Sequence, residues 1–484
     1  MRCQLALCAA KKINFNDSLL SRLNMNSTPT LIQKYNVAGP RYTSYPTVPY
    51  WEEDRFCVTD YLDTLTRSFQ QTNALDGISL YIHLPYCESL CTFCACHHRI
   101  TKKHEVEADY INAVLQEWRL YVDHFKSSST ERIRIREIHL GGGTPTFFSA
   151  ANLATLIQGI FEHAERAPEH AFSFEGHPNN TTAEQLQTLY ELGFRRVSFG
   201  VQDYAPKVQQ AINRIQPFEQ VAKVTNWARD IGYTSISHDL VFGLPHQTLD
   251  SMQDTIKRTA SLQPDRLAFY SYAHVPWIKG NGQRGFNDQD LPSAPEKRAL
   301  YELGKALFAE QGYSEIGMDH FARPTDSLYA AMQTQRLHRN FMGYTETKTR
   351  LMVSLGMSAI ADSWYAFAQN EKHLETYLAR VAAKEFPISR GHLLTAHDLI
   401  IRQHILNIMC QLHTTWAEPE QQFDELPATL QRLLPMQADG LLMIEPNGLR
   451  VTEQGRPYLR NIAMAFDVRL LAKQPETRLF SMTI

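Results

Sequence analysis

Four of the eight cysteines in this 484-residue chain lie close together, and their spacing favours an iron–sulfur cluster. They are Cys87, Cys91, Cys94 and Cys96. Three thiolates separated by three and then two residues can hold one small inorganic cluster from a single continuous loop, as iron–sulfur cubanes allow. Structural zinc sites usually take ligand pairs from two separated elements. A zinc knuckle or a group of merely buried thiols is therefore the less favoured interpretation, since buried structural cysteines rarely cluster so tightly.

If only Cys87, Cys91 and Cys94 are ligands, a four-iron four-sulfur cluster keeps one iron open, and a second ligand can be activated at an open metal position. Cys96 could then be a further ligand of the cluster, or it could stay unligated and have another role. The Cys87-x3-Cys91-x2-Cys94 pattern follows an apolar stretch, SLYIHLP, that is typical of a strand. In these features the chain resembles the radical S-adenosylmethionine superfamily.

Composition limits the classes of protein to consider. Hydrophobic residues make up 43% of the chain, enough for one large domain with one or two smaller ones. The net charge of −3 argues against a dominant nucleic-acid-binding surface. No window approaches the roughly 18 apolar residues that a membrane-spanning helix needs. We therefore expect no nucleic-acid partner and no membrane span, and we expect a monomer. A cytoplasmic location is expected because a thiolate-bound cluster favours a reducing compartment.

The N-terminal stretch MRCQLALCAAKK is a poor signal peptide, because its apolar run is short and lysines follow at once. Residues 1–24 could instead be an extension, with Met25 as an alternative start.

The middle of the chain alternates between strand-like and helix-like segments, which predicts a parallel sheet with right-handed crossovers. Strands are expected over 78–84, 134–140, 171–176, 195–201, 235–243, 266–275 and 313–321, and helices over 108–125, 150–164, 182–194, 218–232 and 251–262. Six or seven such units indicate an α/β fold, an incomplete TIM-like (βα)6 barrel, rather than an open doubly wound sheet. In barrels the chemistry lies at the carboxyl ends of the strands, and the chemically notable residues fall there.

Three regions are expected along the chain. Residues 1–60 form an N-terminal extension and arm, 61–370 the barrel, and 371–484 a mostly helical, winged-helix-like domain. The last contains a helical stretch over 396–412 and a hairpin over 441–453 with Asn447-Gly448 at its turn. No basic recognition helix is visible in it, so we expect a packing role rather than DNA binding.

Polar residues follow successive strands and could anchor a charged ligand. Three glycines, Gly141 to Gly143, follow the second strand without dinucleotide-binding spacing, yet they would let the backbone approach a ligand. Glu175, Gln202, Arg214 and Asp239 are candidate side-chain anchors. Carboxylates can hold ammonium or sulfonium groups, and an arginine fork can hold a carboxylate. Each alone could be an ordinary surface or ion-pairing residue, but their shared position favours a site.

From about Leu31 to the C-terminus the chain resembles the oxygen-independent coproporphyrinogen III oxidase family. The shared segments are QKYNVAGPRYTSYPT, YIHLPYC, CTFCAC, HLGGGTPT, SFGVQD, the Asn213-Arg214 pair, DLVFGLPHQT, PDRLAFYSYAH, GMDHFARP, LHRNFMGYT and GMSAI. The arm motif and GMDHFARP are far more specific than the cluster motif.

The resemblance implies one four-iron four-sulfur cluster held by Cys87, Cys91 and Cys94, and two molecules of S-adenosylmethionine. The first molecule would contact Tyr81, Gly142, Glu175 and Ile360, and the second Phe93, Gly143, Thr144, Gln202, Arg214, Asp239 and Ala273. Cys96 would be a non-ligand thiol near the substrate. Two departures from the family pattern are Ala95, where Gly is usual, and Gly176-His177, where Val-Asp is usual.

The implied reaction converts coproporphyrinogen III to protoporphyrinogen IX in haem biosynthesis. A 5′-deoxyadenosyl radical takes a hydrogen from a propionate β-carbon, carbon dioxide leaves, and one electron passes to an unidentified acceptor, after an unidentified donor has reduced the cluster. The substrate bears four carboxylates, so Arg41 in the arm and Arg323 or Arg339 in the later motifs are candidate contacts; for each, a structural ion pair is the alternative.

Three alternatives remain open at this point. They are a haem chaperone on the same barrel, a haem-acting radical methyltransferase, and a winged-helix regulator that senses iron or oxygen. The haem chaperones typically have Phe where Cys96 stands and lack the arm, so both features favour the oxidase.

Overall fold

Twelve strands form one large sheet in the computed structural model, which describes residues 28–276, 283, 285–473, 475 and 479–483. Their order is β16-β15-β14-β13-β1-β4-β5-β6-β7-β8-β10-β9. Six parallel strands form its centre: β1 (Ile78–Leu84), β4 (Ile133–Gly142), β5 (Ala164–Gly176), β6 (Phe194–Gln202), β7 (Ser235–Phe242) and β8 (Arg266–Ser271). Cys3, Cys8 and Met25 lie outside the described residues.

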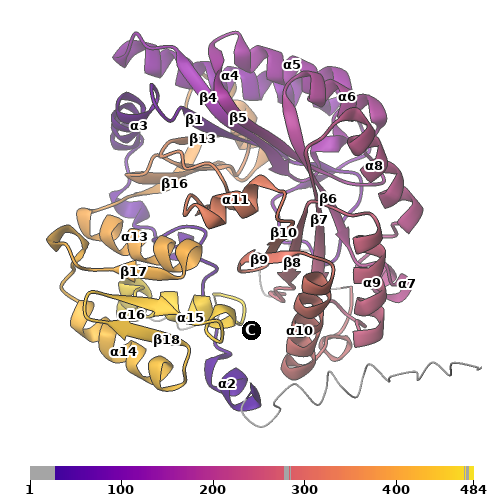
Figure 1. Cartoon of the computed structure of the whole chain (residues 1–484). Helices are drawn as coiled ribbons and strands as arrows, with labels where there is room; N and C mark the ends of the chain where they lie inside the picture. The colour runs from indigo at the N-terminus through magenta and orange to yellow at the C-terminus, as the bar shows by residue number, and fades with distance from the viewer. Residues whose placement is uncertain (1–27, 277–282, 284, 474, 476–478, 484) are drawn as a thin grey trace, which may run out of the picture.

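Helices follow the parallel strands and lie along the outside of the curved sheet (Figure 1). They are α4 (Val106–Ser128), α5 (Ala150–Phe161), α6 (Ala183–Glu191), α7 (Pro206–Ala211), α8 (Phe218–Ile231), α9 (Leu249–Ser261) and α10 (Ala294–Glu310). The five helices expected from the sequence are present. Two of them end earlier than expected, because Ala164 and Phe194 already begin strands.

Local sequence explains where these elements begin and end. Every residue of β1 is buried, as expected for a parallel strand covered on both faces. Thr182 and Gln185 form a reciprocal capping box that starts α6. Gly232 ends α8 in the left-handed conformation, with a φ of 110°.

The fold is the incomplete (βα)6 barrel expected from the sequence, since the edge strands β16 and β9 do not pair with each other. One predicted strand was wrong. Residues 313–321 form an antiparallel hairpin, β9 (Ser314–Gly317) and β10 (His320–Ala322), because Asp319 takes a left-handed φ of 68° at the turn. The sixth strand is also shorter than expected, so Ala273 lies in the loop after it.

A second group of strands extends the sheet beyond β1. β13 (Met352–Leu355) pairs with β1 in parallel, and β14 (Ile360–Asp362), β15 (Ala366–Asn370) and β16 (Ile388–Leu393) follow in antiparallel order. The expected boundary at residue 370 therefore falls between two strands of one sheet. The helical sequence pattern just after residue 370 corresponds to α12 (Leu374–Ala382), which contacts α4. We propose that the barrel domain ends after Leu393.

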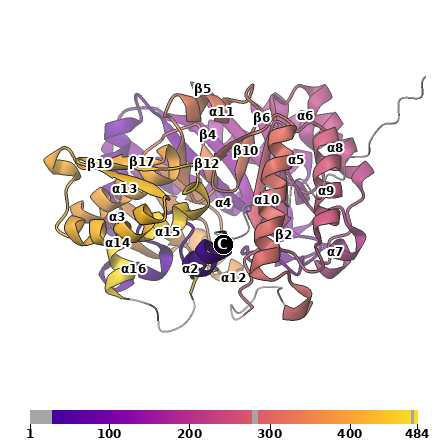
Figure 2. The ribbon, with the colours of Figure 1, turned by 60° about the horizontal axis from the view of Figure 1, so that its bottom comes forward.

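The C-terminal region is mostly helical and carries the expected hairpin. It contains α13 (Ala396–Gln411), α14 (Leu426–Ala438), α15 (Leu459–Met464), α16 (Val468–Ala472) and a sheet of β17 (His413–Thr415), β19 (Gly448–Val451) and β18 (Leu442–Glu445). Most of its buried hydrophobic residues share one cluster with Ile316, Ala322 and Leu328 of the barrel. Figure 2 shows this region against one side of the barrel.

The segment before the barrel bonds to both the barrel and the C-terminal region. It includes α2 (Thr28–Tyr35) and leads to α3 (Val58–Thr72). Between them Arg41 pairs with Asp319 of the barrel at 2.8 Å, and the Tyr42 hydroxyl donates to Asp467 of the C-terminal region at 3.0 Å. The segment therefore fixes the C-terminal region to the barrel.

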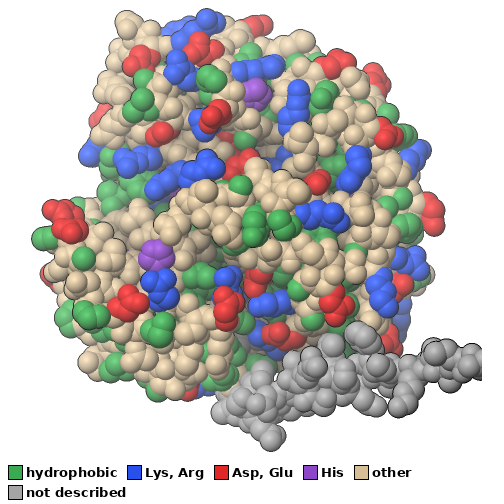
Figure 3. Space-filling view, viewed as in Figure 1, with side chains coloured by type: hydrophobic (Ala, Val, Ile, Leu, Met, Phe, Trp, Pro, Cys, Tyr) green, Lys and Arg blue, Asp and Glu red, His purple; other side chains and the backbone are tan. Residues whose placement is uncertain are grey.

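None of the described helices is both long enough and apolar enough to cross a membrane. On the face drawn in Figure 3, basic and acidic side chains are interspersed, in keeping with the small net charge.

Candidate active site

Two adjoining cavities open at the carboxyl ends of the barrel strands. The smaller has a volume of about 430 Å³ and the larger about 800 Å³. The predicted cluster ligands, the predicted S-adenosylmethionine contacts and Cys96 each line at least one of them. The smaller is lined by Cys87, Cys91, Cys94, Gly143, Thr144 and Arg214, the larger by Tyr81, Ala273 and Ile360, and both by Phe93, Cys96, Gly142, Glu175, Gln202 and Asp239.

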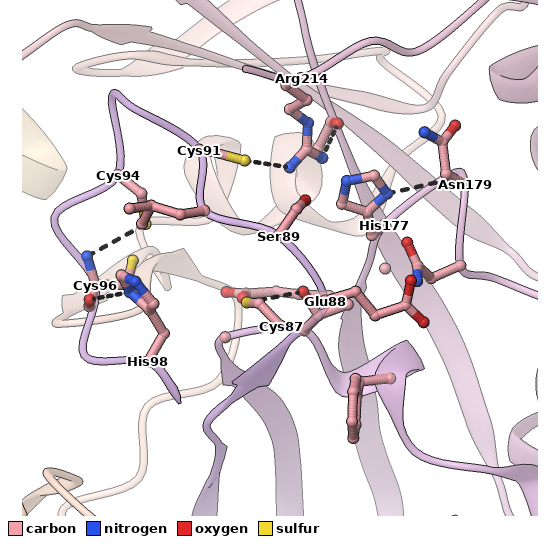
Figure 4. A pocket seen from close by; sticks show the side chains of 18 of the residues that line it. Cys87, Glu88, Ser89, Cys91, Cys94, Cys96, His98, His177, Asn179 and Arg214 are labelled. Atoms are coloured by element: carbon pink, nitrogen blue, oxygen red, sulfur yellow. Dashed lines mark hydrogen bonds between the residues drawn. The ribbon is translucent and has the colours of Figure 1, made fainter. Parts of the chain in front are cut away.

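The cysteine loop follows β1 and returns through a short ladder between β2 (Tyr86–Cys87) and β3 (Arg99–Ile100). Each of the three candidate ligand sulfurs has a polar neighbour. Cys87 Sγ lies 3.2 Å from Thr144 Oγ1, and Arg214 Nη1 lies 3.6 Å from Cys91 Sγ. The backbone N–H of Cys96 donates to Cys94 Sγ at 3.4 Å (Figure 4). Such donors are the groups that tune a sulfur-ligated cluster.

The chemistry of this loop fits a cluster better than a single ion. Among the described residues, no three His, Cys, Asp or Glu side chains converge on one ion position. In a cubane each thiolate binds a different iron, so the sulfurs surround the cluster rather than meet at a point. Three cysteines that line one cavity, each with a polar neighbour, suit that arrangement.

The thiols differ in acidity. Burial raises the pKa of Cys87 to about 11. A hydrogen bond from Cys96 lowers the pKa of Cys94, while the same contact raises the pKa of Cys96. Thiolates are the form that binds metal, so Cys87 must lose its proton when it binds.

Gly142 at the end of β4 and Gly143 just after it hold the cysteine loop in place. Gly142 has a φ of 117° and faces the ring of His83, and a Cβ on Gly143 would lie 2.4 Å from the carbonyl oxygen of Pro85. Gly143 N–H also donates to Leu84 O at 2.9 Å. The backbone at these glycines thus lies close to the segment that leads into the cysteines, and the expected approach to a ligand stays a prediction.

Two carboxyl groups stand in the wall that the cavities share. The Glu175 side chain is 47% exposed and lies 3.4 Å from His139 Nε2. Asp239 is partly buried, and desolvation raises its pKa to about 7, although the Ser198 hydroxyl donates to it at 2.7 Å. Opposite charge from a sulfonium or ammonium group would favour the ionised form of Asp239.

Comparisons with known proteins agree with this arrangement. The model of the Radical SAM superfamily matches residues 81–259. The chain is 38% identical to the oxygen-independent coproporphyrinogen III oxidase of Escherichia coli K12, covering 92% of this chain and 95% of that protein. It is 36% identical to the enzyme of that name from Helicobacter pylori J99 (90% and 95%) and 35% identical to the one from Synechocystis (94% and 97%).

The solved structure of coproporphyrinogen III oxidase (HemN) from Escherichia coli, described as a radical SAM enzyme, superimposes with a TM-score of 0.82 at 37% identity, covering 88% of this chain and 97% of that one. The chain belongs to the oxygen-independent coproporphyrinogen III oxidase family. Membership of this radical SAM family implies one four-iron four-sulfur cluster and S-adenosylmethionine as cofactors.

Sequence reasoning missed several residues of this oxidase-family site. His139, Tyr270, His320, Phe341 and Met342 also line the larger cavity. They come from β4, β8, β10 and the turn between two short strands, β11 (His338–Asn340) and β12 (Gly343–Thr345). The alternation of side chains along a strand could have pointed to His139, Tyr270 and His320, which lie in segments predicted as strands, but not to Phe341 or Met342.

Gln283 was also missed, and no sequence signal pointed to it. Its side-chain amide donates to Phe93 O and to Ala273 O, both at 3.0 Å. It therefore joins the cysteine loop to the loop after β8.

The structure separates the candidate arginines. Arg41 and Arg339 line the larger cavity, together with Arg390, which was not predicted. Arg323 lines neither cavity and instead lies over the ring of Tyr313, 5.2 Å from its centroid. The prediction for Arg323 was therefore wrong.

The departure at Gly176-His177 is accommodated locally. A Cβ on Gly176 would lie 3.0 Å from the ring of Phe199, so the small residue leaves room for that ring. The His177 N–H donates to Thr146 Oγ1 at 3.1 Å, and its side chain lines the smaller cavity. Ala95, the other departure, lines the larger cavity.

Proposed function

We propose that this protein catalyses the oxygen-independent oxidative decarboxylation of two propionate side chains of coproporphyrinogen III, giving the vinyl groups of protoporphyrinogen IX. The observation that carries the proposal is the joined pair of cavities: the three thiols line one, three arginines line the other, and Cys96, Glu175 and Asp239 lie in the shared wall. A cationic cofactor and a polyanionic substrate thus have complementary groups in one connected space.

Cys87, Cys91 and Cys94 would hold the cluster. When bound, the cluster and S-adenosylmethionine supply a 5′-deoxyadenosyl radical that can remove a hydrogen atom from the β-carbon of a propionate. In each round the side chain loses one hydrogen atom, one electron and carbon dioxide. The electron donor and acceptor are separate, unidentified partners of the cytoplasmic protein.

The remaining residues bind and orient. Glu175 and Asp239 would face the positive charge of S-adenosylmethionine, and Arg214 its carboxylate. The Arg214 guanidinium is fixed in position because its Nη2 donates to Gly200 O at 2.6 Å. Cys96, exposed to both cavities, would keep its thiol near the substrate without ligating the cluster.

Two molecules of S-adenosylmethionine are part of the proposal. All four residues proposed for the first molecule line the larger cavity, and six of the seven proposed for the second line the smaller one; Ala273 is the exception. Both volumes lie within the usual range of small-molecule sites.

The test is an anaerobic assay of the reconstituted protein with coproporphyrinogen III, reductant and S-adenosylmethionine. We expect protoporphyrinogen IX and 5′-deoxyadenosine. Stable haem binding without turnover would instead support a chaperone, and methyl transfer from labelled S-adenosylmethionine a methyltransferase. Salt-dependent DNA binding without turnover would support a regulator.

A further inference from the structure

Arg339 is a buried guanidinium whose hydrogen bonds are incomplete. It lies on β11 with 5% of its surface exposed. Its Nη2 donates to Arg41 O at 3.3 Å, and its guanidinium carbon lies 4.6 Å from the ring centroid of Tyr344. Its Nε and Nη1 are both buried without an acceptor among the described residues.

The other two arginines of the larger cavity are already paired within the protein. Arg41 bonds to Asp319 at 2.8 Å and to Ser271 O at 2.9 Å. Arg390 bonds to Glu53 at 2.9 Å and to the Gln369 side chain. No carboxylate of the described chain lies within salt-bridge distance of Arg339, so it differs from both neighbours in lacking a counter-charge.

A buried, unpaired cation is costly unless a partner completes it. No group of the described chain accepts a hydrogen bond from Nε or Nη1 of Arg339. His320 lines the same cavity, and burial lowers its pKa to about 4, so it is neutral at physiological pH and Nδ1 is engaged with Met318 O at 3.0 Å. Phe341 and Met342 next to it are apolar. A carboxylate that enters the cavity would supply both the acceptors and the charge.

We infer that Arg339 binds one of the two propionate carboxylates of coproporphyrinogen III that remain after the reaction. This inference rests on the proposed function. The propionate bound by Arg339 is expected to be one that is not decarboxylated. Strong charge-assisted hydrogen bonds stabilise a carboxylate and so oppose its loss as carbon dioxide. Arg339 would thereby fix the orientation of the macrocycle and direct the other two propionates toward Cys96 and the wall with Glu175.

Binding of air-stable porphyrins, followed by fluorescence quenching in the reconstituted protein, tests the inference without turnover. Three probes are used: coproporphyrin III, its tetramethyl ester, and mesoporphyrin IX, which carries only the two propionates that survive the reaction. The variants are Arg339→Gln and Arg339→Lys, with Arg336→Gln as the matched control, because Arg336 is exposed three residues away.

We expect Arg339→Gln to lower the affinity for coproporphyrin III and for mesoporphyrin IX about 10- to 100-fold. Arg339→Lys should restore part of the lost affinity. The ester should bind the wild type and variants equally, and Arg336→Gln should change nothing. Arg339→Lys keeps the charge, so it decides the matter if Arg339→Gln does not fold. Unchanged affinity in a folded variant, or equal loss for the ester, overturns the inference. Loss for coproporphyrin III alone would assign Arg339 to a reacting propionate and overturn the retained assignment.

Turnover separates this inference from the proposed function. If the wild type makes vinyl product, Arg339→Gln should raise KM about 10- to 100-fold with kcat changed far less. An unchanged KM would remove the role of Arg339 and leave the oxidase function standing. No vinyl product from the wild type would remove the function itself.

Discussion

The Thr144 hydroxyl lies 3.2 Å from the sulfur of Cys87, and this contact connects the loop after β4 to the first candidate ligand of the cluster. Thr144 is 9% exposed, so water replaces it poorly. Hydrogen bonds to ligand sulfurs raise the reduction potential of iron–sulfur clusters.

Thr144→Val should therefore lower the cluster potential while iron loading stays near that of the wild type. Thr144→Ser keeps the hydroxyl and is the matched control. Redox titration followed by electron paramagnetic resonance measures the potential. A Val variant with the wild-type potential would show that the hydroxyl does not reach the ligand sulfur in the loaded protein.

The iron content of cysteine variants tests which cysteines are ligands of the cluster. Cys91→Ala should abolish iron loading, because it removes one of three ligands. Cys96→Ala should keep the iron but lose most turnover. Cys57→Ala, at an exposed cysteine on another element, is the control and should change neither. Equal iron loss in the Cys91 and Cys96 variants would contradict the roles assigned here.

Asp239 predicts a pH dependence of S-adenosylmethionine binding. Its pKa is raised to about 7 by burial, so the carboxyl loses its proton as pH rises through that value. Only the ionised form attracts the sulfonium. The affinity ratio of wild type to Asp239→Asn should therefore rise between about pH 6 and pH 8. Equilibrium dialysis measures it, with Asp250→Asn, an exposed position, as control. A ratio that stays flat or falls would remove Asp239 from the binding site.

Glu117 predicts a pH dependence of stability away from the site. It is fully buried and accepts hydrogen bonds from Gly356 N at 2.7 Å, Tyr377 OH at 2.7 Å and Asn370 Nδ2 at 2.6 Å. Burial raises its pKa to about 7. Between its unfolded pKa of about 4.3 and about 7 the folded state binds more protons, so its contribution to stability falls as pH rises through this window.

The free energy of unfolding of wild type relative to Glu117→Gln should consequently decrease by roughly 2–4 kcal/mol from about pH 5 to pH 8. Urea denaturation at several pH values measures this difference. Glu107→Gln, a substitution of another buried glutamate on the same helix, is measured alongside as a comparison. A difference that grows with pH would mean that Glu117 is ionised in the folded protein throughout.

The alternation of strands and helices could be predicted because each parallel strand is a short buried apolar run between amphipathic helices. β1 and α8 show this directly, since the first is buried throughout and the second ends at a glycine. The hairpin at 313–321 could not be predicted in the same way. Its turn depends on a left-handed Asp319, and one residue with a positive φ leaves little trace in composition.

The cluster ligands were predictable because they are local in the sequence, whereas the substrate end of the cavity is not. Arg41, Arg339 and Arg390 come from the arm, from β11 and from β16. Only the folded sheet brings them together, and only their partners distinguish Arg339 from Arg41. The same limit explains the wrong choice of Arg323 and the failure to find Gln283.

The central claim, that a 5′-deoxyadenosyl radical formed at this cluster attacks a propionate β-carbon, is tested most directly with isotopically labelled substrate. Coproporphyrinogen III deuterated at the propionate β-carbons is incubated anaerobically with the reconstituted protein, and 5′-deoxyadenosine is analysed by mass spectrometry. The account predicts 5′-deoxyadenosine that carries one deuterium, formed together with vinyl product. Unlabelled 5′-deoxyadenosine alongside vinyl product, or S-adenosylmethionine recovered whole, would contradict it.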